Sequence, residues 1–576
     1  MNMTHWKEST IYEIYPRSFA DSNGDGIGDL PGILSKADYL KDLGIDTIWL
    51  TPIYASPDID HGYDISDYYT IQSEYGTMED FELLLQEMHQ RGIRVLMDLV
   101  LNHTSDEHPW FEQSRSSKDN PYRDYYIWRP AKEDGSPPNN WTSYLGKPAW
   151  TLDEQTGEYY LHLYNAKQPD LNWDYPPLRK DMYKMMRFWL DKGIDGFRID
   201  AVNSISKDQR FPDTHQEKLQ ASGEPFTKNG PHIHEYLQEM HKEVFSHYDI
   251  VTAGETSKVV EQNVLLYTHP ARKELNMVLS PEASTLADRT EDEFQTQEWT
   301  LDDLRSILTM WQKDIGEDGG WFGIYFSNHD QRRMVNIFGD PVNYRIQSAK
   351  MLSTLLLTLR GTPFIHQGEE LGMVHNPLLH HIEDFKEQQA LAYYDVMVRE
   401  RGENEEKIME RIRQKSRDHA RTPMQWDDSH AAGFTTGKPW LPVHPDYKEI
   451  NVAAEQQNPH SVLNYYKKMI ALRKENKVLT YGDFKIVLEN HSQIIGYIRW
   501  MDDEAWLVLL NFSGEEAGYE LPDNEADRMR QASFIIGNYS DSQHVHPNIH
   551  IPSGTLRPYE AVVYKSEGLM DDGVSQ

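Results

Sequence analysis

The sequence predicts a (β/α)8 barrel, because three apolar segments with the character of short strands each lead into an acidic side chain. These segments cover residues 196–200, 249–255 and 321–330, and their acids are Asp200, Glu255 and Asp330. Catalytic side chains of such barrels stand at the carboxyl ends of the strands. A single acid there often caps the following helix, but three in the same position indicate a catalytic site.

Arg198 and Asp200 stand two positions apart on the first of these segments. Side chains two apart on a strand share a face, so the guanidinium should lie beside the carboxylate. We expect Arg198 to lower the pKa of Asp200 and keep it ionised. A charged carboxylate held at a rigid strand end is suited to act as a nucleophile.

The remaining barrel strands and the accessory domains follow from apolar runs and changes in pattern. We expect further strands at residues 10–16, 46–52, 94–100, 275–279 and from 361. A weakly periodic stretch at 104–172 is too long for a structureless loop and predicts an inserted small, irregular domain after the third strand. The barrel then spans 1–103 and 173–481, with a helical subdomain at about 375–450, and a C-terminal antiparallel β-sandwich covers 482–576.

The composition is that of a globular enzyme with an acidic surface. The chain has 576 residues, no cysteine and a net charge of −35. The missing thiols exclude disulfides and cysteine metal sites, and the negative charge makes nucleic acid and anionic membranes poor partners. We find no apolar run of membrane-spanning length and no leader before Trp6. We therefore expect a cytoplasmic monomer or weak homo-oligomer.

Five motifs carry a resemblance to a known family. They are GFRID at 196–200, AGE at 253–255, NHD at 328–330, DLVLNH at 98–103 and QPDLN at 168–172. In this order they resemble signature regions of glycoside hydrolase family 13, the α-amylase family, and the last is typical of its oligo-1,6-glucosidase and α-glucosidase branch. The resemblance extends from about residue 5 to about residue 565.

The resemblance implies a retaining glycosidase that needs no organic cofactor. Asp200 would be the nucleophile, and Glu255 the general acid that later activates water. Retention requires the two carboxyl groups to lie about 5–5.5 Å apart. We expect burial and nearby anions, Asp330 among them, to keep Glu255 protonated before the reaction.

Further residues are implied as contacts of a small oligosaccharide. In the family the matching positions hold the glucose at the non-reducing end or border the leaving sugar. Three positions depart from the family pattern: His61 and His419 stand where Asn is usual, and Tyr164 where Phe is usual. The expected substrate-binding residues are Asp60, Tyr63, His103, Tyr164, Arg198, Ala201, His329 and Arg421.

The segment 21–29 has oxygen-bearing side chains at alternate positions and Gly26 in its turn. This pattern is typical of a calcium loop, although Gly32 occupies the position where an EF-hand has its bidentate Glu, and a metal-free Asp/Gly-rich turn is the alternative. The resemblance favours structural calcium, with magnesium as a second candidate. The implied ligands are Asp21, Asn23, Asp25, the carbonyl of Ile27, and Asp29.

The residue after the nucleophile bears on which bond is cleaved. In the family it tends to be Val in enzymes that prefer α-1,6 links and Ala or Thr in those that prefer α-1,4 links. Here it is Ala201, so we expect an exo-acting α-glucosidase for maltose and short maltooligosaccharides, with transglucosylation as a side reaction. The alternative is an oligo-1,6-glucosidase or dextran glucosidase.

Two other relatives fit the sequence less well. Sucrose isomerases carry an Arg/Asp-rich stretch after the NHD motif, whereas Gln331-Arg332-Arg333-Met334 stands here. Non-catalytic transporter subunits of this family have a membrane anchor and often lack catalytic acids, whereas this chain keeps all three.

Overall fold

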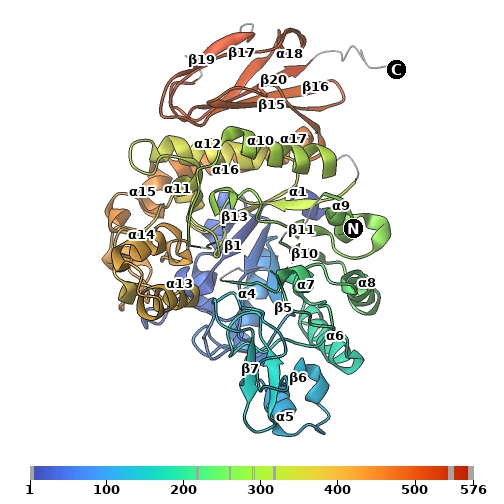
Figure 1. The fold of residues 1–576 in the computed structure, drawn as a ribbon. Coiled ribbons are helices and arrows are strands. Elements are labelled where there is room, and N and C mark those ends of the chain that lie inside the picture. The colour runs from blue at the N-terminus through green and yellow to red at the C-terminus, as the bar shows by residue number, and fades with distance from the viewer. Residues whose placement is uncertain are drawn as a thin grey trace.

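The computed structural model describes residues 5–215, 220–257, 261–288, 290, 292, 294–315, 319–542 and 551–567. Eight parallel strands close into a barrel in the order β1, β13, β12, β11, β10, β9, β5 and β2, which confirms the predicted fold class (Figure 1). In chain order these strands are β1 (Ile11–Ile14), β2 (Thr47–Leu50), β5 (Arg94–Val100), β9 (Gly196–Asp200), β10 (Val251–Glu255), β11 (Met277–Leu279), β12 (Phe322–Ile324) and β13 (Thr362–His366).

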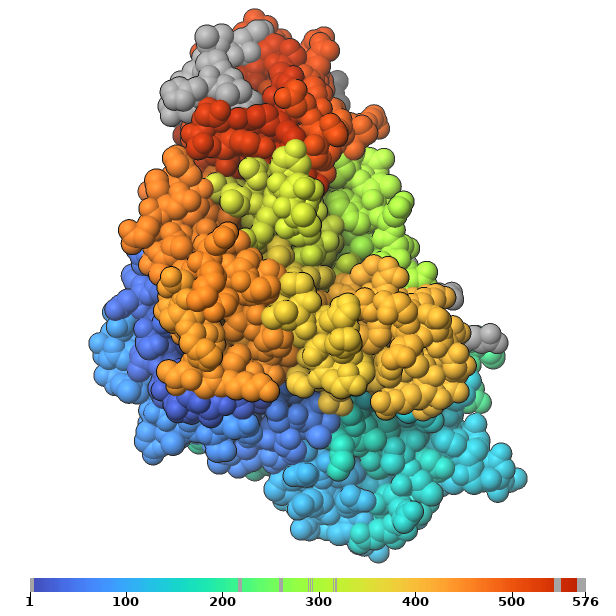
Figure 2. Space-filling view, turned by 90° about the vertical axis from the view of Figure 1, so that its left-hand side faces the viewer, coloured from blue at the N-terminus to red at the C-terminus, as the bar shows by residue number. Residues whose placement is uncertain are grey.

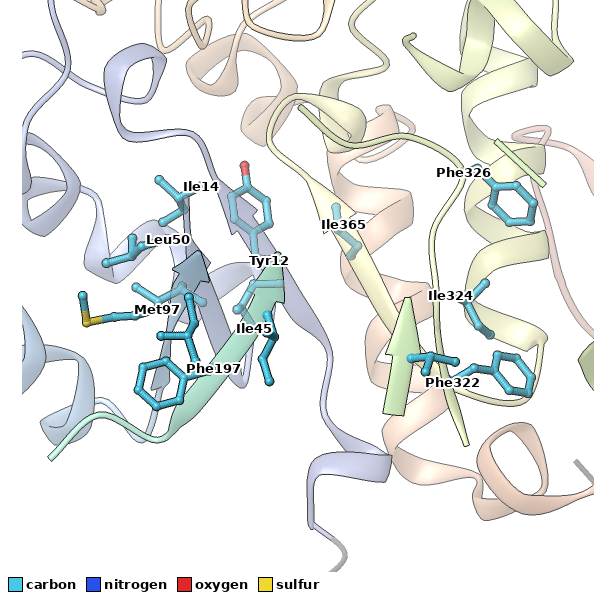
Figure 3. Close-up of a cluster of buried hydrophobic side chains, with 14 of the residues drawn as sticks. Tyr12, Ile14, Ile45, Leu50, Met97, Phe197, Phe322, Ile324, Phe326 and Ile365 are labelled. Carbon is cyan, nitrogen blue, oxygen red and sulfur yellow. The ribbon is translucent and has the colours of Figure 1, made fainter. Parts of the chain in front are cut away.

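Alternation along these strands decides which side chains enter the barrel. On β9, Phe197 joins the apolar layer that faces the helices (Figure 3), whereas Arg198 and Asp200 point inwards. On β1, Tyr12 belongs to the same outer layer, and Glu13 faces the interior. Because alternate residues of a strand share a face, charged side chains of otherwise apolar strands point towards the barrel axis.

The interior beneath the acids is filled by large side chains. Trp6, Trp49, Trp321 and Phe364 form a buried cluster with apolar residues of several strands. The barrel is therefore a packed core with no room for a channel, as is usual for this fold. A substrate site can open only at the carboxyl ends of the strands.

Helices surround the barrel. The long helix α4 (Met78–Gln90) begins with a capping box in which Thr77 and Asp80 satisfy each other's backbone N–H groups, an arrangement that stabilises a helix start. The other helices around the barrel are α1 (His5–Glu8), α2 (Leu30–Ser35), α3 (Ala37–Leu43), α6 (Pro176–Asp191), α7 (Glu224–Thr227), α8 (Ile233–Glu243), α9 (Glu261–Thr268), α10 (Leu301–Thr309), α11 (Met334–Phe338), α12 (Arg345–Thr358), α16 (Val462–Glu475) and α17 (Lys477–Tyr481).

The segment between β5 and α6 forms a small separate layer at the lower end of the molecule in Figure 1. It contains α5 (Pro109–Ser116) and a three-stranded sheet in the order β6 (Trp128–Pro130), β8 (Glu158–Leu161), β7 (Trp150–Asp153). A β-bridge between His103 and Asp170 ties its two ends together beside β5. Near it, β3 (Tyr54–Ala55) pairs with β4 (Asp67–Ile71).

A second group of helices lies beside the barrel and contains α13 (Gln388–Tyr394) and α14 (Glu405–Lys415). It has its own apolar cluster, which includes Phe385 and Leu441. The short helix α15 (Val452–Gln457) follows and packs with the barrel core. Figure 2 shows this yellow and orange group directly above the cyan segment 104–172. The two meet where Gln389 Nε2 donates to the Tyr144 carbonyl at 3.3 Å and Lys147 pairs with Glu400.

The C-terminal part is an antiparallel sheet domain that caps α12 and α16 (Figure 1). Its five-stranded sheet has the order β14 (Asp483–Ile486), β15 (Ile494–Met501), β16 (Glu504–Asn511), β20 (Ala561–Glu567), β18 (Ser533–Gly537), and β17 (Ala517–Glu520) pairs with β19 (Ser553–Leu556). The helix α18 (Asp523–Arg528) precedes β18. Buried Arg499 donates to the carbonyls of Thr358 and Gly482, which fixes the sheet to the barrel helices.

Candidate active site

A cavity of about 220 Å³ opens where the carboxyl ends of the barrel strands meet the segment 104–172 and the helical group. It brings together the three acids and most of the residues that the sequence predicts for the site. The predicted residues that line it are Asp60, Tyr63, His103, Tyr164, Asp200, Glu255, Asp330 and Arg421. Arg198, Ala201 and His329 lie against these residues and do not line the cavity.

Arg198 contacts two of the three predicted acids. Its Nη1 lies 2.7 Å from Asp200 Oδ1, and its Nη2 lies 2.9 Å from Glu255 Oε2. The same Nη1 also donates to Asp98 at 2.9 Å. Asp98 lies directly beside Arg198, because β5 and β9 pair in a register that makes these two residues partners. One buried guanidinium therefore positions the tips of Asp200 and Glu255 close to each other.

We expected the pKa of Asp200 to be lowered, and this direction is wrong. Burial raises the pKa of Asp200 well above its usual value, and the charges of Glu255 and Asp98 add to this. Arg198 opposes the rise but does not reverse it, since it is shared among three carboxyl groups. The sequence argument counted the cation and omitted desolvation and the neighbouring anions.

The surroundings of Glu255 also differ from the expected burial among anions. Its side chain is 26% exposed, against 11% for Asp200. Its Oε2 accepts a hydrogen bond from the Ala201 backbone N–H at 3.0 Å in addition to the contact with Arg198. Glu255 is therefore the more open of the two acids, where a leaving group and water can reach it.

Ala201 has an unusual backbone. It lies in the left-handed region with φ 39° and ψ 38°, at the start of a short 3-10 turn. Non-glycine residues seldom adopt this conformation. It aims the Ala201 N–H at Glu255, so this residue acts on the site through its backbone. We expected its side chain to shape the room for the leaving sugar, but the methyl group does not line the cavity.

Asp330 is surrounded by cationic groups. Its Oδ1 pairs with Arg417 at 2.8 Å and with Arg421 at 2.7 Å, and its Oδ2 lies 3.0 Å from His329 Nε2. Burial alone would raise the pKa of Asp330, but His329 and the two arginines outweigh burial and hold that pKa well below its usual range. Asp330 is thus a fixed anion beside the other two acids.

The Asp60 and His103 side chains meet through Gln168. Gln168 Nε2 lies 2.9 Å from Asp60 Oδ2 and 3.1 Å from His103 Nε2.

Tyr63 packs its ring parallel to the His329 ring, with centroids 5.5 Å apart, and its hydroxyl donates to Asp98 Oδ2 at 3.0 Å. Asp98, which also accepts from Arg198, thus braces the strand ends.

One wall of the cavity is a pair of stacked tyrosines. Tyr164 and Tyr144 have ring centroids 4.9 Å apart and nearly parallel planes. Such a flat aromatic surface suits the apolar face of a sugar ring. Tyr164 also contacts the His103 ring at 4.9 Å, so the wall is continuous with the floor of the cavity.

Sequence reasoning missed eight residues that line the cavity. Gln168 opens the quoted QPDLN motif, Gln331 directly follows the NHD motif, and Arg417 precedes Arg421 in one segment, so a signal existed for these three, whereas nothing in the sequence places the other five here. The missed residues are Tyr144, Leu145, Asn165, Gln168, Gln331, Gln388, Gln389 and Arg417.

The predicted calcium loop 21–29 is a compact turn. The side-chain oxygens of Asp21, Asn23 and Asp25 each accept a hydrogen bond from the backbone N–H two residues further on. Across the described ranges, no three His, Cys, Asp or Glu side chains are grouped so that they could hold a metal. A cation here would need Asn23 and the Ile27 carbonyl besides the acids, and calcium stays a prediction.

Comparison with known proteins agrees with this geometry. The family described as alpha amylase, catalytic domain, matches residues 13–482. The chain is 52% identical to an oligo-1,6-glucosidase of Parageobacillus thermoglucosidasius, over 98% of this chain and 99% of the relative.

Two solved structures share the whole architecture. A trehalose-6-phosphate hydrolase of Bacillus licheniformis is 46% identical with a TM-score of 0.90, over 97% of this chain and 99% of that one. A mutant trehalulose synthase is 46% identical with a TM-score of 0.93, over 97% and 100%. Within the described part of the chain, no helix has the length and apolar character to span a membrane. The chain therefore belongs to the α-amylase family, glycoside hydrolase family 13, as its motifs predicted.

Proposed function

We propose that this protein is an exo-acting, retaining α-glucosidase that releases glucose from the non-reducing end of short α-1,6-linked glucosides. The observation that carries the proposal is the shared contact of Asp200 and Glu255 with Arg198 at one cavity. Two carboxyl groups beside one anomeric carbon are what retaining hydrolysis requires. The oligo-1,6-glucosidase with 52% identity supports the α-1,6 linkage.

In the proposed reaction Asp200 attacks C1 of the glucose while Glu255 gives its proton to the leaving oxygen. A glucosyl–Asp200 ester results, and Glu255 then takes a proton from the water that cleaves this ester. The reaction needs Asp200 ionised and Glu255 protonated when attack begins, so Asp200 must lose its proton although burial raises its pKa. A sugar that replaces the water gives transglucosylation.

Asp330 and the residues around it would bind the sugar hydroxyls. Its oxygens are anionic and face the cavity, and Asp60, linked to Gln168, offers a further acceptor. The contact of Gln389 with the Tyr144 carbonyl joins two walls of the cavity. Because these walls are joined, the cavity can accept the end of a saccharide chain more readily than its middle. This supports cleavage from the chain end.

Preference for α-1,4 links is the second candidate, and Ala201 is the observation that favours it. The α-1,4 preference expected from this residue has less support than the alternative, because the oligo-1,6-glucosidase relative matches nearly the whole chain. The side chain of Ala201 also lies outside the cavity lining.

Initial rates on isomaltose and maltose at equal concentration test the proposal. We expect faster release of glucose from isomaltose, and proton NMR should show α-glucose as the first product. Faster cleavage of maltose would establish the second candidate in its place. First release of β-glucose would overturn retention, and faster cleavage of trehalose 6-phosphate than of both disaccharides would overturn the substrate class.

A further inference from the structure

Both ring nitrogens of His329 face carboxylate oxygens. Nδ1 lies 2.5 Å from Glu13 Oε1, and Nε2 lies 3.0 Å from Asp330 Oδ2. The backbone N–H of His329 also donates to Glu13 Oε1 at 3.2 Å. A neutral imidazole has only one N–H, so it can satisfy only one of these carboxylates. The second nitrogen would then place a lone pair against an anion.

The Tyr63 hydroxyl also indicates that both ring nitrogens of His329 carry a proton. It lies 2.7 Å from His329 Nε2 and donates its own hydrogen to Asp98 Oδ2. Its oxygen can therefore only accept a hydrogen from His329. Three acceptors thus surround the ring, two at Nε2 and one at Nδ1. This environment fits the doubly protonated imidazolium.

Glu13 has no direct route to a substrate. It lies on β1 with 1% of its surface exposed and does not line the cavity. Its second oxygen is 3.1 Å from His366 Nδ1, and His366 Nε2 donates to the Ala420 carbonyl at 2.9 Å. Glu13 therefore lies in a buried row that runs from Asp330 through His329 to His366.

We propose that Glu13 is a positioning residue that keeps His329 doubly protonated and directed at Asp330 and Tyr63. It acts through His329, one contact behind the residues that would bind sugar. The role of His329 rests on the proposed function, but the protonation of its ring does not.

The electrostatics agree with this geometry. Burial lowers the pKa of His329, but Asp330 and Glu13 outweigh burial and raise it to about 9. Burial raises the pKa of Glu13, but His366 and His329 outweigh burial and lower it to about 2. The charged and titratable groups around the ring are Glu13 on β1, Asp98 on β5, Asp330 beside it, His366 on β13 beyond Glu13, and Tyr15, Tyr63, Arg417 and Arg421 on the loops.

Glu13→Gln tests the proposal with little change in shape. The amide oxygen can still accept from His329 Nδ1, and the amide N–H₂ can donate to His366 Nδ1, so folding should be kept while the charge is lost. A 1H–13C spectrum of histidine-labelled full-length protein, with the His329 signal assigned by its loss in His329→Gln, reports the titration of the ring. We expect the His329 midpoint to fall by about one to three pH units in Glu13→Gln, and Glu13→Asp to keep it near the wild-type value.

Glu370→Gln is the matched control. Glu370 is also a buried carboxyl group, and it accepts hydrogen bonds from Tyr12 and Tyr39. Because these partners lie away from His329, the His329 midpoint should not move in this variant. The kcat/KM of Glu13→Gln on p-nitrophenyl α-glucoside should fall relative to wild type as pH rises from 6 to 8, and that of Glu370→Gln should not.

A His329 ring that is neutral at pH 7 in the wild-type protein would overturn the inference, even if Glu13→Gln failed to fold. An unchanged midpoint in folded Glu13→Gln would do the same. Neither result depends on substrate. Failure of the wild-type protein to release glucose from any tested glucoside would instead overturn the proposed function and leave the titration result valid.

Discussion

Arg198 Nη2 lies 2.9 Å from Glu255 Oε2, so the proposed acid is held by the same cation as the proposed nucleophile. The Arg198 side chain is 1% exposed and touches Asp98 and Asp200 as well. Three carboxyl groups thus depend on one buried positive charge for position and for compensation.

Asp200→Asn should abolish turnover and stabilise the fold at neutral pH. Loss of the nucleophile should lower kcat by at least about 10⁴-fold. A carboxyl group with a raised folded-state pKa contributes stability below its unfolded pKa and loses that contribution as pH rises through its folded pKa. Asn imitates the protonated form, so its advantage over wild type should grow from pH 4 to pH 7. Thermal unfolding at both pH values measures this. Lower stability of the variant at pH 7 would contradict the reasoning.

Glu255→Gln should separate the role of the acid from that of the nucleophile. A poor leaving group such as glucose needs a proton, whereas 2,4-dinitrophenolate leaves without one. We expect the rate on isomaltose to fall by about 10²–10⁴-fold, and burst release of dinitrophenol from its α-glucoside to persist. Asp200→Asn, used as the control, should show no burst. Equal loss on both substrates in Glu255→Gln would contradict the assignment.

Arg198→Met should destabilise the barrel. Removal of the cation leaves buried carboxyl groups uncompensated, which typically costs about 3–5 kcal/mol. Urea unfolding followed by fluorescence measures the change. Arg210→Met is the matched control, because Arg210 pairs with Asp208 at 2.5 Å on the surface with 85% of its side chain exposed. Because solvent screens this exposed pair, its loss should change the free energy of unfolding little. Similar losses for both variants would count against the central role of Arg198.

Ala201→Val should change linkage preference and reduce stability together. Residue 201 has φ 39°, and a β-branched side chain there should cost about 1–3 kcal/mol. Because Val tends to follow the nucleophile in family members that prefer α-1,6 links, we expect the rate ratio of isomaltose to maltose to rise by about tenfold. Ala431→Val serves as control, since Ala431 has φ 48° and does not line the cavity. It should lose stability and keep the ratio. A constant ratio in Ala201→Val would remove residue 201 as a determinant.

Removal of calcium should lower thermal stability and leave kcat unchanged. A cation bound only by the folded loop 21–29 stabilises the fold by mass action, about 2.7 kcal/mol at a hundredfold excess over Kd. The measurement is the difference in Tm between calcium and EGTA buffers. This difference should vanish in Asp21→Ala and persist in Asp134→Ala, whose oxygen accepts from Ser136 in an exposed turn. A wild-type Tm that does not respond to calcium would refute the metal site.

The sequence predicted the parts of the site that depend on local pattern. Period-two alternation was enough to place Arg198 and Asp200 on one inward face, and the strand ends brought Glu255 and Asp330 to the same side of the barrel. The pKa of Asp200 could not be predicted in this way, because it depends on how many anions share one guanidinium. That number is fixed by strand register, which the sequence does not state.

Contacts between residues far apart in the sequence could not be predicted either. Tyr144 stacks on Tyr164 and accepts a hydrogen bond from Gln389, yet no motif marks Tyr144. The row from Asp330 to His366 joins strands at opposite ends of the barrel sequence through Glu13. Tyr144, Glu13 and His366 read alone as ordinary strand or loop, and only the closed barrel brings them beside the residues that the motifs mark.

The ion pair between Lys147 and Glu400 spans the two walls that meet over the cavity. The chain has no cysteine, so one thiol at each of these exposed positions would be the only pair available for labelling. Spin labels there would report the width of the entrance in solution, and would tell whether sugars enter through a standing gap or only when the walls part.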